Sequence, residues 1–185
     1  MFGLADDGEL IAKALGGSQR AWLSLVRRHE KRVYNLAYRM TGNRQDALDL
    51  MQEAFLAVYR NLPNYRAEGV FAAWLLRIVA NRAVDFLRRR RGNPLHKAAE
   101  VDEDVIVADD SSHRSVEQDS LRSTLLRLMA QLSNDQRLVV ELKFFQHLTF
   151  EEIAGQLGIP ENTAKTRLYT ALQKLRGNEE LKHAL

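Results

Sequence analysis

Apolar residues in the first half of the chain recur at intervals of three and four positions, and this spacing predicts amphipathic helices. The clearest stripe consists of Trp22, Leu25, Val26, Val33, Leu36, Ala37 and Met40. Gly42 ends this helix, and the side chain of Asn43 can cap the next one. The same spacing predicts further helices at residues 9–15, 45–62 and 71–91. No stretch here alternates as a half-buried strand would, so we expect a four-helix lobe over residues 1–91.

The helical pattern is interrupted over residues 92–120. This segment is rich in acidic residues and serine and is apolar only at 105–108, which predicts a flexible acidic linker. Helical spacing then predicts four more helices, at residues 121–132, 134–145, 150–157 and 161–176. The expected fold is all-α, with two helical domains at 1–91 and 121–178, few contacts between them, and a short tail at 179–185.

Residues 149–176 carry a helix-turn-helix pattern. Thr149 and Glu152 have the spacing of a capping box, Gly158 stands where a left-handed cap ends a helix, and Pro160 suits a first helical turn. The last helix is expected to bury Ala164, Leu168, Ala171, Leu172 and Leu175. Its N-terminal half presents the polar residues Glu161, Asn162, Lys165, Thr166 and Tyr169. Recognition helices offer such residues to base edges in the major groove, so the pattern favours DNA binding over an ordinary helical hairpin.

Charge is distributed unevenly along the chain, although the net charge is only +3. Residues 1–91 hold 16 Lys and Arg against 9 Asp and Glu, residues 92–120 hold 2 against 8, and residues 121–185 hold 9 against 7. The basic surplus therefore lies in the first lobe.

Several classes of protein are excluded by what the sequence lacks. The absence of cysteine excludes disulfide frameworks, zinc ribbons and thiol catalysis, and it favours a reducing cytoplasm. The five histidines show no metal-binding spacing and are expected at the surface or its boundary, and no phosphate-binding Gly loop or GxSxG motif occurs. The N-terminus does not read as a signal peptide, and no apolar run reaches the roughly 20 residues of a membrane span. We therefore expect a cytoplasmic protein without cofactor, metal or intrinsic catalysis.

Two blocks of the sequence resemble the extracytoplasmic-function sigma factors of bacterial RNA polymerase. DALDLMQEAFLAVYRNL followed by FAAWLLRIVANRAVDFLRRRR is similar to the family's second conserved region. LSNDQRLVVELKFFQHLTFEEIAGQLGIPENTAKTRLYTALQKLR is similar to its fourth region, and the order and separation of the blocks agree as well. The resemblance implies a protein that binds core RNA polymerase and directs promoter-specific transcription initiation.

The resemblance also implies a polymerase contact. It places Asp49, Gln52 and Glu53 against a coiled coil of the beta-prime subunit. Positions three and four apart share one helix face, so these side chains would offer carboxylates and an amide to a basic partner. Taken without the resemblance, the same cluster fits a solvated polar face.

By the same resemblance, the loop 61–70 and the following helix read the minus-ten promoter element as single-stranded DNA. Aromatic faces for stacking and a basic track for phosphates suit that task. The candidate residues are Tyr65, Arg66, Phe71, Arg77, Asn81, Asp85, Arg88, Arg89 and Arg90. Trp74 lies on the apolar stripe and is expected in the core. The arginines at 88–91 are expected to hold phosphates or to form a solvated basic helix end.

The fourth region is implied to bind the minus-thirty-five element as duplex DNA and to touch the polymerase beta flap. The candidate DNA contacts are Asn162, Lys165, Thr166, Arg167, Tyr169 and Lys174, of which Arg167 and Lys174 are assigned to phosphates. Leu48, Ala164 and Thr170 depart from the residues common in the family, so the promoter sequence is not transferred from relatives.

Several alternatives remain open. The linker residues Asp102, Glu103, Asp104, Asp109 and Asp110 either mimic phosphates in polymerase channels or belong to a solvated spacer. An anti-sigma factor is a frequent partner in the family and is expected here. Two other functions fit the pattern. One is an autonomous activator or repressor whose N-terminal lobe senses a ligand or forms a dimer, and the other is an adaptor that binds polymerase or a membrane regulator without reading DNA.

Overall fold

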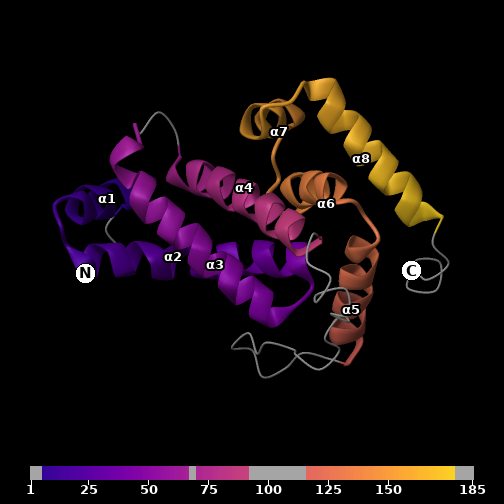
Figure 1. The fold of residues 1–185 in the computed structure, drawn as a ribbon, viewed down its shortest axis with the longest axis horizontal. Helices are drawn as coiled ribbons and strands as arrows, with labels where there is room; N and C mark the ends of the chain where they lie inside the picture. The colour runs from indigo at the N-terminus through magenta and orange to yellow at the C-terminus, as the bar shows by residue number, and fades with distance from the viewer. Residues whose placement is uncertain (1–5, 67–69, 92–115, 178–185) are drawn as a thin grey trace.

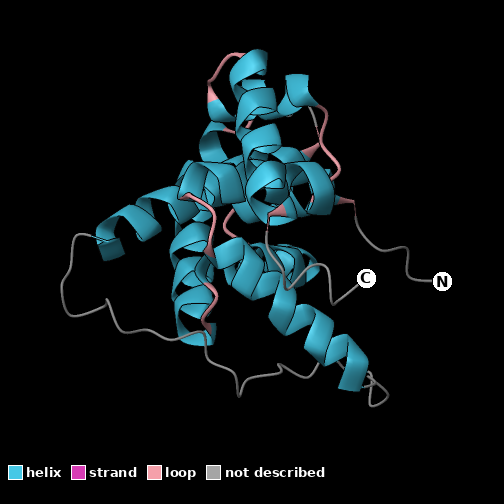
Figure 2. Cartoon of the chain, turned by 90° about the vertical axis from the view of Figure 1, so that its right-hand side faces the viewer, coloured by secondary structure: helices cyan, strands magenta, loops and turns pink. Residues whose placement is uncertain are grey.

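The structure is a computed structural model and describes residues 6–66, 70–91 and 116–177. These residues form helices joined by short turns, and no strand occurs among them (Figure 2). The predicted all-α class is therefore confirmed. None of the described helices is long and apolar enough to cross a lipid bilayer.

The N-terminal lobe contains four helices in the order that the periodicity predicts. They are α1 (Asp7–Leu15), α2 (Gln19–Thr41), α3 (Arg44–Asn61) and α4 (Phe71–Arg91), with a 3-10 turn η1 (Leu62–Asn64) after α3. Gly42 ends α2 in the left-handed conformation, at φ 71°, and Asn43 Oδ1 accepts from the Asp46 amide at 3.1 Å. The long helix α2 packs against α1, α3 and α4 (Figure 1). Its predicted apolar stripe is therefore the centre of the lobe.

The C-terminal lobe contains α5 (Val116–Ala130), α6 (Asn134–Val140), α7 (Phe150–Leu157) and α8 (Glu161–Arg176). Two details differ from the sequence prediction. Helix α5 begins at Val116, inside the segment assigned to the linker, because serine and acidic residues are also favoured in the first turns of a helix. The helix after Ser133 changes at Glu141 into a π-helical turn, η3 (Glu141–Phe145). The acidic linker residues at 102–110 lie outside the described residues.

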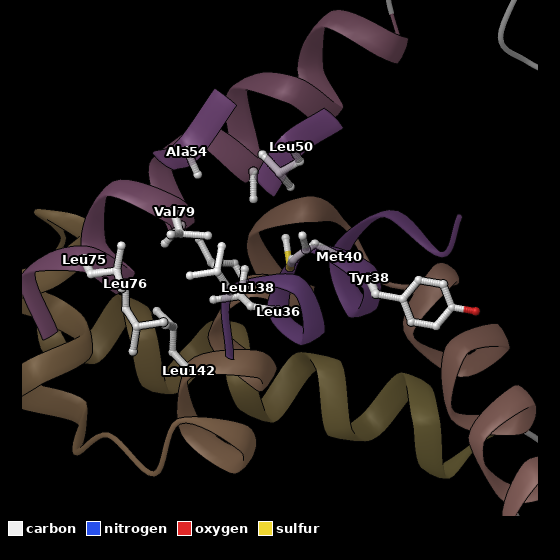
Figure 3. Packing of buried hydrophobic residues seen from close by; sticks show 14 of the residues in the cluster. Leu36, Tyr38, Met40, Leu50, Ala54, Leu75, Leu76, Val79, Leu138 and Leu142 are labelled. Atoms are coloured by element: carbon white, nitrogen blue, oxygen red, sulfur yellow. The ribbon is translucent and has the colours of Figure 1, made fainter. Parts of the chain in front are cut away.

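The two lobes pack on each other, which the expectation of few contacts did not foresee. Leu138 of α6 and Leu142 of η3 join the same buried cluster as Leu36, Leu76 and Val79 of the N-terminal lobe (Figure 3). Leu142 and Leu36 have no exposed surface. Burial of apolar side chains therefore extends across the boundary between the lobes and holds them together.

Arg137 strengthens this boundary from within. Its side chain is 7% exposed and donates from Nε to the Met129 carbonyl at 2.7 Å and from Nη2 to the Ala130 carbonyl at 3.0 Å. It also donates from Nη1 to the Met40 carbonyl in the last turn of α2. Carbonyls at a helix C-terminus lack partners within the helix and carry partial negative charge. One guanidinium thus caps the ends of α2 and α5 together.

Candidate nucleic-acid and protein interfaces

The outer face of α3 brings together the predicted acidic and amide cluster. Asp49 and Gln52 are exposed and Glu53 is half-buried. Gln45 Nε2 donates to Asp49 Oδ1 at 3.3 Å, and Glu53 Oε2 lies 2.7 Å from Arg89 Nη2 on α4. The cluster is accessible to a partner.

Two apolar residues, Leu56 and Tyr59, continue this face. Each leaves 55% of its surface exposed, and Leu56 follows Gln52 by one helical turn. The Tyr59 ring packs edge-on against Trp22, with 5.0 Å between centroids. Both residues are apolar but lie off the buried stripe of α3. This position off the stripe could have identified them in the sequence as exposed apolar residues. Exposed apolar side chains beside polar groups are typical of the centre of a protein interface.

Three aromatic rings cluster at the start of α4. The rings of Tyr65, Phe71 and Trp74 have centroids 5.1 to 5.7 Å apart. Phe71 is 4% exposed, so its ring supports the cluster from beneath. Trp74, which the pattern places in the core, is only half-buried and lines a groove together with Tyr65 and Arg66. The surface that can accept a flat ring is therefore formed by Tyr65 and Trp74.

A second groove of about 400 Å³ runs between the end of α3 and the outer face of α4. Its polar lining consists of Asn61, Asn64, Arg77, Asn81, Arg82 and Asp85. It brings three of the predicted minus-ten residues together and adds Arg82, which the sequence pattern does not single out. Arg88 and Arg89 are exposed further along α4, whereas the side chain of Arg90 lies outside the described part of the chain.

The helix-turn-helix forms as its local signals predict. Thr149 Oγ1 accepts from the Glu152 amide at 3.2 Å, and Glu152 Oε2 accepts from the Thr149 amide at 2.7 Å, so the capping box is complete. These bonds lower the pKa of the Glu152 carboxyl, with the backbone bond as the main cause. Gly158 ends α7 in the left-handed conformation at φ 64°. Pro160 is the N-cap of α8, one position earlier than a first-turn residue.

The N-terminal half of α8 presents the predicted polar face to solvent. Asn162, Thr166 and Tyr169 are exposed, Tyr169 by 58%. Lys165 is half-buried and pairs with Glu161, with 2.6 Å between Nζ and Oε1. The residues expected to be buried are buried or half-buried except Leu172, which is 37% exposed.

The two residues assigned to phosphates make contacts inside the lobe. Arg167 Nη2 lies 2.8 Å from Asp135 Oδ2, and Lys174 Nζ donates to Gln136 Oε1 at 3.2 Å. Both partners belong to α6. Each side chain keeps further N–H donors, so a phosphate contact at either residue would share or replace the existing partner.

Comparison with known proteins identifies the family. Residues 25–92 match the family model for Sigma-70 region 2, and residues 122–175 match that for Sigma-70, region 4. The RNA polymerase sigma-H factor of Pseudomonas aeruginosa is 30% identical over 91% of this chain and 91% of its own length. The ECF RNA polymerase sigma factor SigM of Mycobacterium tuberculosis is 30% identical over 91% of this chain and 82% of its own. The chain belongs to the extracytoplasmic-function sigma factors.

Further relatives agree with this sigma factor in sequence and fold. SigE of Mycolicibacterium smegmatis is 39% identical over 84% of the chain, which spans 60% of that relative's length. The structure of CnrH in complex with the cytosolic domain of CnrY has a TM-score of 0.64 at 25% identity and covers 92% of this chain and 94% of CnrH. Sigma factors are transcription initiation factors and not enzymes. Family membership therefore confirms the predicted role in transcription initiation and the prediction that the protein has no catalytic activity of its own.

The first helix of the sigma factor lies outside both matched regions and supports the aromatic cluster. Asp7 Oδ2 lies 3.0 Å from His29 Nε2 and Asp7 Oδ1 lies 2.7 Å from Arg28 Nη1. The His29 ring packs edge-on against Phe71 at 5.3 Å. His29 is 8% exposed, so the expectation of a surface or boundary histidine is wrong at this position, because Asp7 supplies the partner that a buried imidazole needs. Burial, together with the charges of Asp7 and Asp6, raises the pKa of Tyr65.

Proposed function

We propose that this sigma factor binds core RNA polymerase through α3 and recognises promoters with both lobes. The N-terminal lobe, residues 1–91, reads the minus-ten element and opens the DNA, and the C-terminal lobe, residues 121–178, binds the minus-thirty-five element. Residues 92–120 connect them, and 179–185 form a tail. The observation that carries the proposal is the exposed polar face of α8 on a fully formed helix-turn-helix.

The polymerase contact is proposed for Asp49, Gln52 and Glu53 with the beta-prime coiled coil. Leu56 and Tyr59 extend the contact, because apolar anchors beside charged groups add affinity while the charges add specificity. All five residues lie on one helix and are accessible or half-buried in the free protein. A second contact, between the C-terminal lobe and the beta flap, is proposed from family membership.

The minus-ten contact is proposed for the aromatic cluster and the α3–α4 groove. An unstacked base can stack on the face of Tyr65 or Trp74, while Arg66, Arg77 and the exposed arginines of α4 hold phosphates. Asn81 and Asp85 supply an amide and a carboxylate for base edges. Phe71 contributes by fixing the other two rings.

The minus-thirty-five contact is proposed for the N-terminal half of α8 in the major groove. Lys165, Thr166 and Tyr169 reach base edges, and Asn162 lies beside them at the helix start. Arg167 and Lys174 hold phosphates with the N–H donors that their partners on α6 leave available.

An anti-sigma factor is proposed as a regulatory partner. Solved structures show CnrH with the cytosolic domain of CnrY, and the sigma factor RpoE of Bartonella quintana with the anti-sigma factor NepR. The second of these shares 20% identity with the chain, so it supports the fold, with a TM-score of 0.65. The place of action is proposed to be the cytoplasm, at the nucleoid when the protein is bound to polymerase.

Transcription in vitro with purified core polymerase tests this function. Promoter-specific transcripts are expected only when the sigma factor is added, and they should be lost when Lys165, Thr166 and Tyr169 are all replaced by alanine. Transcripts that need another sigma factor would instead identify an activator. Binding to polymerase without any promoter-specific transcript would identify an adaptor.

A further inference from the structure

The first helix bonds to α2 through a single carboxylate. Asp7 stands in the first turn of α1. Its Oδ1 lies 2.7 Å from Arg28 Nη1 and its Oδ2 lies 3.0 Å from His29 Nε2. A carboxylate can only accept a hydrogen bond, so Nε2 carries the proton in the second contact. The Asp7 side chain is 21% exposed and the His29 side chain 10%, so the orientation of the imidazole is fixed from α1 with little competition from water.

The His29 ring carries this contact to the start of α4. It packs against the ring of Phe71 with 5.3 Å between centroids and 61° between planes. Edge-on pairs of this kind hold one ring at a defined angle to the other. Phe71 in turn packs against Tyr65 at 5.5 Å and 83°, and against Trp74 at 5.7 Å and 37°. Asp7, His29 and Phe71 thus form one line of contacts from α1 to the two accessible rings.

A second contact brings α1 to the same cluster. Helix α1 touches the η1 turn, which ends directly before Tyr65 (Figure 1). The Tyr65 amide donates to the Leu62 carbonyl of that turn at 3.1 Å, so the turn fixes the backbone from which the ring projects. Burial raises the pKa of the Tyr65 hydroxyl, and the charges of Asp7 and Asp6 raise it further, as expected for carboxylates close to the hydroxyl. The start of α1 therefore borders Tyr65 directly as well as through Phe71.

Fixed rings favour the reading of a single strand. An unstacked base gains affinity by lying on an aromatic face, and a face that moves must be ordered when the base binds. A ring that is held in place before binding avoids this cost. Phe71 is the first residue of α4, so its side chain has no preceding turn of its own helix to pack over. Contacts from α1 and α2 supply that support.

We propose that Asp7 and His29 are positioning residues for recognition of the minus-ten element. Through Phe71 they hold Tyr65 and Trp74 in the orientation that accepts an unstacked base. The inference rests on the proposed function, because it deepens the proposed minus-ten contact. Asp7 precedes residues 25–92, which match the region 2 model, so the match does not assign it this role.

Fluorescence of Trp74 tests the positioning without polymerase or DNA. The chain has two tryptophans, so Trp22→Phe leaves Trp74 as the sole emitter. In this background the anisotropy decay should show little fast local motion, and Asp7→Ala and His29→Ala should each increase that motion. Glu9→Ala removes a carboxylate from an exposed ion pair on the same helix and should leave the decay unchanged. Equal decays in the parent and all three variants would overturn the proposal.

Binding of holoenzyme to DNA tests the consequence. One probe is a single-stranded oligonucleotide with the minus-ten element of a promoter that the holoenzyme transcribes, and the other is a duplex with only its minus-thirty-five element. Asp7→Ala should raise the Kd for the single strand roughly tenfold, because stacking on a mobile ring is weaker. The Kd for the duplex and for core polymerase should stay unchanged, and Glu9→Ala, with the same change of charge, should alter none of the three. An equal loss on both DNA probes would overturn the proposal, because it would indicate a general loss of folded protein.

Asp7→Asn separates the hydrogen bond from the charge. Its amide oxygen can still accept from His29, so the Trp74 decay and the affinity for the single strand should stay close to those of the wild type. Losses equal to those of Asp7→Ala would overturn the role of the hydrogen bond. Thermal melting followed by circular dichroism checks the folding of each variant. If His29→Ala unfolds, the three comparisons among wild type, Asp7→Ala and Asp7→Asn decide.

Tyr65→Ala distinguishes this inference from the proposed function. If the rings bind the minus-ten strand, Tyr65→Ala weakens the single-strand complex whether or not α1 positions them. A loss in Tyr65→Ala without a loss in Asp7→Ala would keep the proposed minus-ten contact and overturn the positioning role. Unchanged affinity in both variants, with increased motion of Trp74 in Asp7→Ala, would overturn the minus-ten contact of these rings and the positioning role with it.

Discussion

Arg89 on α4 is bonded to Glu53 on α3, with 2.7 Å between Nη2 and Oε2. The first residue is proposed to hold a DNA phosphate and the second to face polymerase, so the pair links two proposed binding events. The side chains are 61% and 39% exposed, so the bond adds little to folding stability. Arg89 can therefore release Glu53 to bind a DNA phosphate, and Glu53 can release Arg89 to bind polymerase.

Reversal of charge on α3 should weaken polymerase binding. The double variant Asp49→Lys with Glu53→Lys places like charges against a basic partner and should cost several kcal/mol of binding free energy. The free energy of unfolding should change by less than about 1 kcal/mol, because Asp49 is exposed and the bond between the partly exposed Glu53 and Arg89 adds little to stability. Titration of labelled protein with core polymerase measures the loss. Glu9→Lys with Glu30→Lys changes the net charge equally on other helices, and equal weakening by that control would contradict the assignment.

Base reading and phosphate holding should respond differently to alanine. Tyr169→Ala should lose roughly 1 to 3 kcal/mol on the cognate promoter and relax preference at particular base pairs. Arg89→Ala should weaken all promoters alike and lower the salt slope by about one. Holoenzyme binding to promoter variants at several salt concentrations distinguishes them. A sequence-independent loss from Tyr169→Ala would remove it from the readout residues.

The Glu161 carboxylate competes with DNA for Lys165. Glu161→Gln removes a negative charge at the start of the recognition helix and frees an ammonium that lies 2.6 Å away. Affinity of the holoenzyme for minus-thirty-five DNA should rise several-fold, most clearly at low salt. Glu30→Gln on α2 is the matched control. Unchanged affinity in Glu161→Gln would mean that the carboxylate does not compete with DNA, and reduced affinity would mean that it contacts a base instead.

Acid should weaken the first helix of the helix-turn-helix. The bonds from Thr149 hold the folded pKa of Glu152 below its ordinary value of 4.5. Because the folded pKa is lowered, the stabilisation is complete above that value and is lost as pH falls through the folded pKa. Wild type should therefore be more stable than Glu152→Gln at pH 7, and the difference should shrink below pH 4.5. Urea unfolding across this range measures it, with Glu151→Gln on the same turn as control. A constant difference would indicate a contribution independent of charge.

The helices were predictable because their signals are local. Periodic apolar residues, the caps at Asn43 and Thr149, and the left-handed glycines at 42 and 158 act within a few residues of their own position. The polar face of α8 and the cluster on α3 follow from the same periodicity. Family resemblance added the assignment of these faces to partners.

The packing of the lobes was not predictable in this way. Glu141 follows a helical apolar stripe, and an isolated carboxylate in such a pattern is expected in water. Its burial depends on Arg39, which bonds to it from 102 residues earlier in the chain, and on a π turn that no local signal marks. The burial of His29 likewise depends on Asp7. The accessibility of Phe71 and Trp74 was not predictable either. Both residues fit an apolar stripe, and only tertiary packing decides which ring is accessible.

The π-helical turn also sets a constraint on chain length. A helix advances about 100° per residue, so removing one residue from 141–145 would convert the turn to regular helix and rotate everything after it by that amount. The hydrophobic residues of α7 would then be rotated out of their present register with the core. Substitutions at exposed positions of this turn are tolerable, whereas deletion of any one of its residues would redirect the recognition helix. Insertions and deletions should therefore be rarer in this turn than in any surface loop of the lobe.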